Sequence, residues 1–124
     1  MKLVVAVISP DKIDLVRDAL PEPDAYIYYI NQVGDIREPV EGIYRCQKYL
    51  EPRARLRVEI IVVNEMLLQE VVDAVMKAAA TDSEQHVSSG NIFVLPLDAW
   101  YRIPSRQANS AETAESQEKA TASK

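Results

Sequence analysis

The sequence alternates short β-branched runs with segments in which apolar residues recur every three or four positions. Residues 2–8 consist of Lys2 and a continuous apolar run, which predicts a strand that is covered on both faces or lies centrally in a sheet. Residues 55–63 begin with alternating charged and apolar positions and end in an uninterrupted apolar run, so this strand is half exposed at its start and buried at its end. Residues 25–33 and 91–95 predict two more strands, and residues 99–103 are a candidate for another.

Two helices are predicted from the spacing of apolar residues and from the signals at the helix ends. Ser9 and Pro10 predict an N-cap followed by a proline at the first helical position, and the sequence Pro-Glu-Pro after Leu20 ends this helix. Asn64 is the expected cap of a second helix, which ends near residue 80. The apolar stripes are Ile13, Val16 and Leu20 in the first helix and Leu68, Val71, Val72, Val75 and Ala79 in the second.

The order of these elements is β-α-β-β-α-β, which is typical of an α+β ferredoxin-like sandwich with both helices on one face of the sheet. The other face needs a cover, and a symmetric oligomer provides one. Residues 34–52 contain prolines, glycines and scattered charges without sustained periodicity, so they predict a long excursion, a feature that is usually functional or disordered. Residues 107–124 have no apolar side chain larger than alanine and are expected to be disordered.

Composition limits the classes of function. The chain has 124 residues, 48% of them hydrophobic, which fits one domain with its own core. A net charge of −5 disfavours non-specific binding to nucleic acid or anionic membrane, and no apolar run is long enough for a membrane span. The single cysteine, Cys46, cannot form an internal disulfide, so the chain is expected to be cytoplasmic. Five basic residues and one acidic residue between positions 44 and 57 favour a local site for an anion.

Three stretches resemble the PII signal-transduction proteins: SPDKIDLVRDAL at residues 9–20, GIYRCQKYLEPRARLRVEIIVV at residues 42–63, and NIFV with YRI at residues 91–94 and 101–103. The resemblance covers residues 1–106 in one order. It implies a homotrimer with a nucleotide in each intersubunit cleft, where the T-loop, residues 35–54, meets the loop at residues 81–91. Family members bind adenine nucleotides, often with a small metabolite, and reposition the T-loop to engage a transporter, enzyme or regulator.

Carried over by position, the resemblance implies five nucleotide-binding residues. Arg37 corresponds to the arginine at the base of the T-loop, and Gly90 and Asn91 lie in the nucleotide loop, where Asn91 replaces a phosphate-binding lysine. Arg102 matches the first of two closing arginines. Pro104 replaces the second, and Arg106 is its candidate substitute. In the T-loop, Tyr44, Arg45 and Tyr49 are the candidate partner-contacting residues, and Tyr49 falls where some family members are uridylylated.

The departures from the family pattern change the expected ligand. The segment TDSEQHVSSGN stands where the family has a compact glycine-rich loop, and two charges that would face a triphosphate are missing. Each charge-assisted hydrogen bond contributes roughly 1.5 to 3 kcal/mol, so ADP or AMP is favoured, and ATP is a weaker candidate. Some diverged PII-like relatives respond to bicarbonate, which is the candidate second ligand.

Other classes of function are less well supported by the sequence. A metal- or metabolite-binding trimer of the same fold without nucleotide sensing is the alternative, although clustered His, Cys or acidic ligands are missing, and no metal site is predicted. An RNA-binding domain lacks paired aromatic residues on its sheet, and no nucleophile-base pair indicates an enzyme. The alternation of Arg53, Arg55 and Arg57 fits either a ligand-facing row or a solvated edge that pairs with Glu51 and Glu59. Tyr44 and Tyr49 are either exposed or packed.

Overall fold

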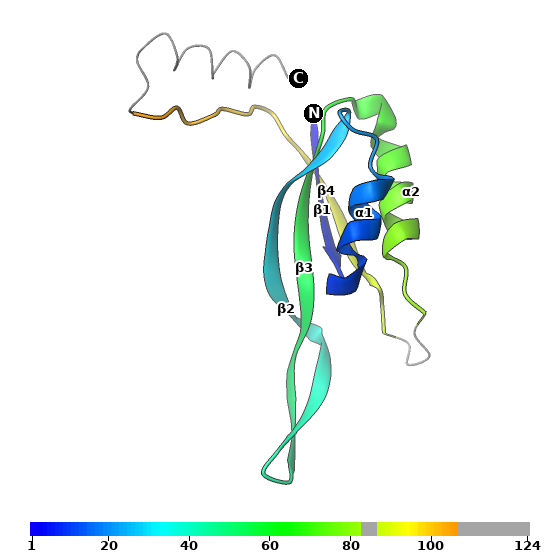
Figure 1. Ribbon diagram of the computed structural model, residues 1–124, viewed down its shortest axis with the longest axis vertical. Helices are drawn as coiled ribbons and strands as arrows, with labels where there is room; N and C mark the ends of the chain where they lie inside the picture. The colour runs from blue at the N-terminus through cyan, green and yellow to red at the C-terminus, as the bar shows by residue number, and fades with distance from the viewer. Residues whose placement is uncertain (83–86, 107–124) are drawn as a thin grey trace.

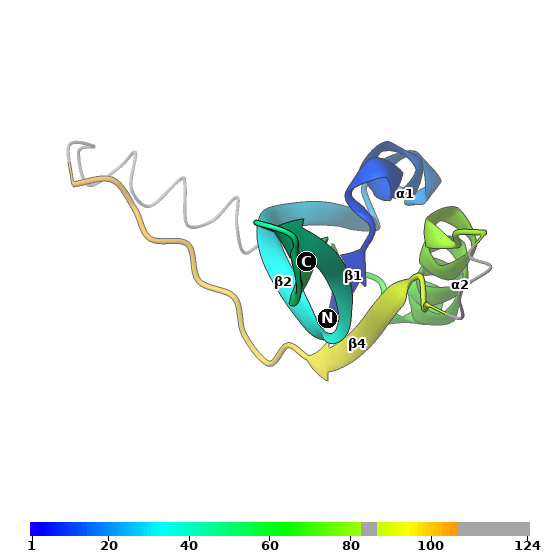
Figure 2. The same cartoon turned by 90° about the horizontal axis from the view of Figure 1, so that it is seen from below.

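A computed structural model of the chain describes residues 1–82 and 87–106, which form one antiparallel sheet with its helices on a single face (Figure 1, Figure 2). Two short 3-10 turns lead directly into the two α-helices. The elements in chain order are β1 (Lys2–Ile8), the 3-10 turn η1 (Pro10–Lys12), α1 (Ile13–Ala19), β2 (Ala25–Tyr44), β3 (Gln47–Val62), the 3-10 turn η2 (Glu65–Leu67), α2 (Leu68–Ala79) and β4 (Gly90–Pro96).

The strand order in the sheet is β2-β3-β1-β4. Each of the three neighbouring pairs is antiparallel, with Val4 level with Ile60 on one side and with Val94 on the other. This order and the two crossover helices confirm the α+β ferredoxin-like βαββαβ sandwich. The end of β1 at Ile8 lies beside the start of β4 at Gly90, so the segments that follow β1 and precede β4 meet at one end of the sheet.

The hydrophobic core lies between the helices and the sheet face that they cover. Alternate residues of β1 and β3 supply the sheet side, and the predicted helical stripes supply the other side. The buried members are Val4, Ala6, Ile8, Val16, Leu20, Ala25, Val58, Ile60, Val62, Val71, Val75 and Ala79. Burial of this apolar surface is the main force that fixes the helices on the sheet.

The two helix starts use their capping residues differently. Asn64 is the cap that the sequence predicts, because its side chain accepts a hydrogen bond from the Met66 backbone N–H at 3.1 Å. Ser9 has extended backbone angles and is followed by Pro10 in the first turn, but its side chain makes no capping hydrogen bond. Instead, the Ser9 hydroxyl accepts a hydrogen bond from Arg55. The predicted N-cap at Ser9 and the proline after it are confirmed, although the Ser9 hydroxyl contacts the Arg55 guanidinium and not a backbone N–H of the first turn.

The predicted excursion at residues 34–52 is a β-hairpin. Strands β2 and β3 remain paired, apart from an irregularity between Asp35 and Val40, up to the pair Tyr44 and Gln47. Arg45 and Cys46 make the two-residue turn with positive φ values of 51° and 65°, as a primed hairpin turn requires. The expectation of an irregular segment is therefore wrong. The hairpin ladder is stabilised by backbone pairing, which needs no apolar periodicity, and it projects beyond the helices (Figure 1).

The chain after β4 continues without a helix or strand through residue 106, so the candidate strand at residues 99–103 is not formed. Trp100 makes an edge-to-face contact with Tyr28, with ring centroids 5.4 Å apart, and side-chain packing takes the place of strand pairing here. The expected disorder of residues 107–124 lies outside the described residues. No helix in the described part of the chain has the length and apolar character needed to cross a membrane.

Candidate functional site

The candidate site lies at the end of the sheet from which the β2–β3 hairpin projects. Three segments that are distant in sequence meet there: the turn after β1, the base of the hairpin, and the chain that enters β4 from α2. Of the predicted nucleotide loop, residues 81–91, the structure describes residues 81–82 and 87–91. The two described ends of this loop are joined, since the Ser89 hydroxyl accepts a hydrogen bond from the Thr81 backbone N–H at 2.8 Å.

Arg55 connects these three segments. Its side chain is 2% exposed, and its Nη1 donates to the Ser9 hydroxyl at 3.2 Å. Its Nη2 donates to the Ser88 carbonyl oxygen at 3.0 Å and to Glu38 Oε2 at 3.4 Å. Its Nε lies 3.5 Å from Asp35 Oδ2 but makes no hydrogen bond. A buried guanidinium thus joins the hairpin base to both neighbouring turns.

The irregularity at the hairpin base orients Glu38 toward the nucleotide loop. Asp35 Oδ1 accepts hydrogen bonds from the backbone N–H groups of Arg37 at 3.0 Å and Glu38 at 3.1 Å. These two hydrogen bonds stabilise the turn that the chain makes at the bulge. Arg53 Nε donates to the Glu38 carbonyl oxygen at 2.9 Å. The Glu38 carboxylate then accepts a hydrogen bond from the Ser88 backbone N–H at 2.9 Å. The hairpin and the loop are therefore in direct contact.

The three alternating arginines of β3 have three different environments, and the interpretation of a solvated edge holds only in part. Arg55 is buried among acidic and hydroxyl side chains and is not solvated. Arg53 donates to the backbone of Glu38. Arg57 pairs with Glu59 at 3.4 Å, as the interpretation of a solvated edge expected. Arg55 differs from the other two because the bulge in β2 brings two carboxylates over its position.

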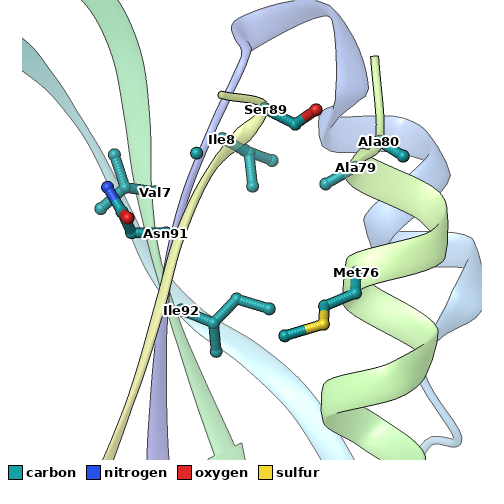
Figure 3. A pocket seen from close by; sticks show the side chains of 9 residues that line it. Val7, Ile8, Met76, Ala79, Ala80, Ser89, Asn91 and Ile92 are labelled. Atoms are coloured by element: carbon teal, nitrogen blue, oxygen red, sulfur yellow. The ribbon is translucent and has the colours of Figure 1, made fainter. Parts of the chain in front are cut away.

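Gly90 and Asn91 begin β4 at this end of the sheet. Gly90 has a φ of 134°, and a Cβ atom there would lie 1.8 Å from the Val7 carbonyl oxygen, so only glycine fits. Asn91 is level with Val7, which is itself level with Arg57 on the next strand. The Asn91 side chain points away from α2, toward the sheet face that the helices leave open (Figure 3).

A pocket lies between β4, β1 and the end of α2, beside the Gly90 turn (Figure 3). Ile8, Ile92, Met76 and Ala79 make it mainly apolar, and Ser89 contributes a polar group at its edge. Its volume is about 240 Å³. Pockets that hold a whole small-molecule ligand measure roughly 300–1,000 Å³, so this pocket supplies at most part of such a site.

The three other predicted nucleotide-binding residues are arginines with exposed side chains. Arg37 is in the hairpin base, but its side chain is exposed. Arg102 and Arg106 are exposed residues of the segment after β4. Because β4 runs from Gly90 beside Ile8 to Pro96 beside Lys2, that segment leaves the sheet at the end opposite the hairpin (Figure 1). Within one chain, the structure does not bring these arginines to Gly90 and Asn91.

The candidate partner-contacting residues cluster at the hairpin tip. Tyr44 is 63% exposed and Tyr49 is 44% exposed. The Arg45 guanidinium carbon lies 5.3 Å from the centroid of the Tyr44 ring. The Tyr49 ring covers Gly42 on the facing strand, where a Cβ atom would lie 2.5 Å from the ring. Both alternatives for the tyrosines therefore hold in part, because Tyr44 and Tyr49 are exposed while Tyr49 also packs across the hairpin.

Comparisons with known proteins show to which family the chain belongs. The family model described as nitrogen regulatory protein P-II matches residues 1–107. The chain belongs to the PII family. Nitrogen regulatory protein GlnK1 of Methanosarcina mazei is 32% identical to this PII protein over 106 residues, covering 83% of this chain and 89% of the relative.

Two bacterial relatives show a similar degree of identity over more of the chain. The nitrogen regulatory protein P-II of Rhizobium etli is 32% identical over 114 residues, covering 89% of this PII protein and 97% of the relative. Nitrogen regulatory protein GlnK of Escherichia coli is 31% identical over 114 residues, covering 90% and 98%. The family is one of regulatory proteins, and the alignments span nearly the whole length of its members.

The residues that sequence reasoning missed are Asp35, Glu38, Ser9, Ser88 and the role of Arg55. One signal was present in the sequence: two acidic residues, Asp35 and Glu38, lie in the segment that pairs with the arginine-bearing strand. The strand register was not fixed by the sequence, however, and Arg55 pairs with Val33 only because of the bulges in β2. A one-residue shift would place every side chain on the opposite face.

Proposed function

We propose that this PII protein is a homotrimeric regulator that binds an adenine nucleotide in each intersubunit cleft and controls a target protein through its hairpin. The observation that carries the proposal is the Arg55 cluster, which joins the hairpin base to the loop after α2 by contacts of 3.0 to 3.5 Å. A ligand that contacts this loop changes the environment of the hairpin base. The target is a protein such as a membrane transporter or an enzyme, and the names of the relatives favour nitrogen regulation.

The trimer is supported by the sheet face that the helices leave open (Figure 2). Leu3 and Val5 of β1 are level with Leu95 and Phe93 of β4 on that face. Phe93 is 54% exposed and Leu95 is 43% exposed. Contiguous exposed apolar side chains of this kind mark an interface, and closed symmetric assembly buries the same face on every subunit.

Two features of the single chain support an intersubunit position for the ligand. The pocket at Gly90 is too small for a whole nucleotide, and Arg102 and Arg106 lie at the other end of their own sheet. A neighbouring subunit is therefore the source of the closing arginines at each site. Gly90 and Asn91 contribute from β4, and Arg37 contributes from the hairpin base.

The expected ligand is ADP or AMP, because Asn91 and Pro104 are uncharged at the two positions where the family resemblance implies a positive charge facing phosphate. Bicarbonate is the candidate second ligand, because the five basic residues and one acidic residue between positions 44 and 57 favour a small anion. The alternative, a metal-binding module, gains no support from residues 1–82 and 87–106, which contain no group of three or more His, Cys, Asp and Glu side chains that could hold an ion.

Light scattering and calorimetry test the proposal together. The trimer predicts a mass about three times the 13.9 kDa of the chain. ADP or AMP should bind at least as tightly as ATP, and Arg102→Ala should weaken the binding of either. A monomer at micromolar concentration, or a trimer that binds none of the three nucleotides at millimolar concentration, contradicts the proposal. A tenfold preference for ATP contradicts the ligand assignment alone.

A further inference from the structure

The Glu38 carboxylate contacts groups that are also suited to bind an exogenous oxyanion. Its Oε2 accepts from the Ser88 backbone N–H at 2.9 Å and lies 3.4 Å from Arg55 Nη2. A backbone N–H together with a guanidinium is the donor pair that commonly binds phosphate oxygens in proteins. The Ser88 N–H belongs to the loop that leads into Gly90, so the resident carboxylate occupies a donor of the proposed nucleotide site.

Charge and exposure make Glu38 the replaceable partner of Arg55. One guanidinium faces two carboxylates, so the cluster carries one negative charge more than Arg55 neutralises. The Asp35 side chain is 13% exposed and also accepts two backbone N–H groups, whereas the Glu38 side chain is 29% exposed. Glu38 can therefore turn into solvent at lower cost, while Asp35 keeps Arg55 in place.

We propose that the Ser88 N–H and the Arg55 guanidinium form an oxyanion site that Glu38 fills in the absence of ligand, and that a phosphate oxyanion displaces the Glu38 carboxylate. The inference rests on the proposed nucleotide function for its physiological ligand, but free phosphate has the same chemistry. The exchange leaves Arg55 paired with an anion, because the phosphate takes the place that the Glu38 carboxylate vacates. Glu38 then loses its contact with the loop, which releases the bulge at residues 36–39.

This competition couples the ligand to the hairpin. If a site is open for only a fraction of the time, its apparent affinity for the ligand is the intrinsic affinity multiplied by that fraction. Removing the internal competitor therefore raises the affinity for phosphate, and binding of phosphate lowers the occupancy of the Glu38 contact to the same extent. The hairpin base is consequently more mobile when the oxyanion is bound.

The test compares Glu38→Gln with Glu41→Gln in the full-length protein, following the Ser88 amide resonance in ¹⁵N-resolved NMR. Glu41 is a matched control, because it lies on the same strand and pairs only with the exposed Lys48, at 3.4 Å. Inorganic phosphate, ADP and adenosine are titrated separately. In Glu38→Gln the side chain that competes with the ligand is uncharged and accepts weaker hydrogen bonds from Ser88 and Arg55. The affinity of this variant for phosphate and ADP should therefore be about tenfold higher than that of wild type. Adenosine should bind all variants equally, and Glu41→Gln should stay within about twofold of wild type.

Two outcomes separate the two proposals. Tighter phosphate binding by Glu38→Gln, without binding of ADP or adenosine to any variant, supports the oxyanion site and contradicts the nucleotide function. The oxyanion site is overturned if ADP and phosphate bind to Glu38→Gln with the same affinity as to wild type, or more weakly. Glu38→Ala serves as the second variant if Glu38→Gln does not give the wild-type circular dichroism spectrum, and the same criteria apply to it.

Discussion

Replacement of Arg55 by methionine tests the buried cluster from which the account starts. Methionine fills much of the same volume with a flexible apolar side chain, so the main loss is the guanidinium itself. Four partners lose a contact: the Ser9 hydroxyl, the Ser88 carbonyl oxygen and the carboxylates of Asp35 and Glu38. The two carboxylates are left near each other without a counter-charge.

The magnitude follows from the burial of these partners. Removing one member of a buried ion pair costs roughly 3 to 5 kcal/mol, because the remaining charge is uncompensated. Glu38 is 29% exposed and can turn to water, so we expect a loss at the lower end, about 3 kcal/mol of the free energy of unfolding. Adding Asp35→Asn to Arg55→Met removes one of the repelling charges and should restore at least about 1 kcal/mol.

The assay is urea unfolding at one protein concentration, since assembly makes apparent stability depend on concentration. Arg17→Met is the control, because Arg17 is 55% exposed and makes one ion pair with Asp14 at 3.5 Å. Its change should stay within about 0.5 kcal/mol of wild type. If Arg55→Met is no more destabilising than Arg17→Met, the cluster does not stabilise the hairpin base and the reasoning is wrong.

Two further substitutions test the start of β4. Gly90→Ala should lower the free energy of unfolding by about 3 kcal/mol, because the new Cβ atom would lie 1.8 Å from the Val7 carbonyl oxygen at a φ of 134°. Urea unfolding measures this loss, and wild-type stability would contradict the described path of the chain. Asn91→Lys should raise the affinity for ATP about tenfold by adding a charge-assisted hydrogen bond, as measured by calorimetry. An unchanged ATP affinity would place the phosphates elsewhere.

The sequence predicts the core of the fold because burial leaves a periodic signal. The boundaries of β1, the cap at Asn64 and the helical stripes all follow from apolar spacing and end signals. The hairpin was not predicted, since both of its faces meet solvent and its ladder is stabilised by backbone hydrogen bonds. The strand predicted at residues 99–103 is not formed. Tyrosine, tryptophan and isoleucine there favour a strand, but the segment does not pair with the edge of the sheet.

The residues predicted for the candidate site were those carried over, position by position, from the family resemblance. Gly90 and Asn91 lie at the site, whereas the contribution of Arg102 and Arg106 depends on a second subunit. Asp35, Glu38 and Arg55 meet because bulges in β2 set the register with β3, and bulges of this kind have no composition signal. The contact between Glu38 and Ser88 spans 50 residues and could not be inferred from local pattern.

Hydrogen exchange of the ligand-free and ADP-saturated protein tests the central claim that a ligand at the loop after α2 controls the hairpin. The account predicts faster exchange of the backbone amides at residues 36–38 when ADP is bound, because Glu38 leaves Ser88 and Arg55. Helix α2 should exchange at the same rate in both states, since its buried face is unaffected. Identical exchange at the hairpin base with and without saturating ADP would contradict the claim.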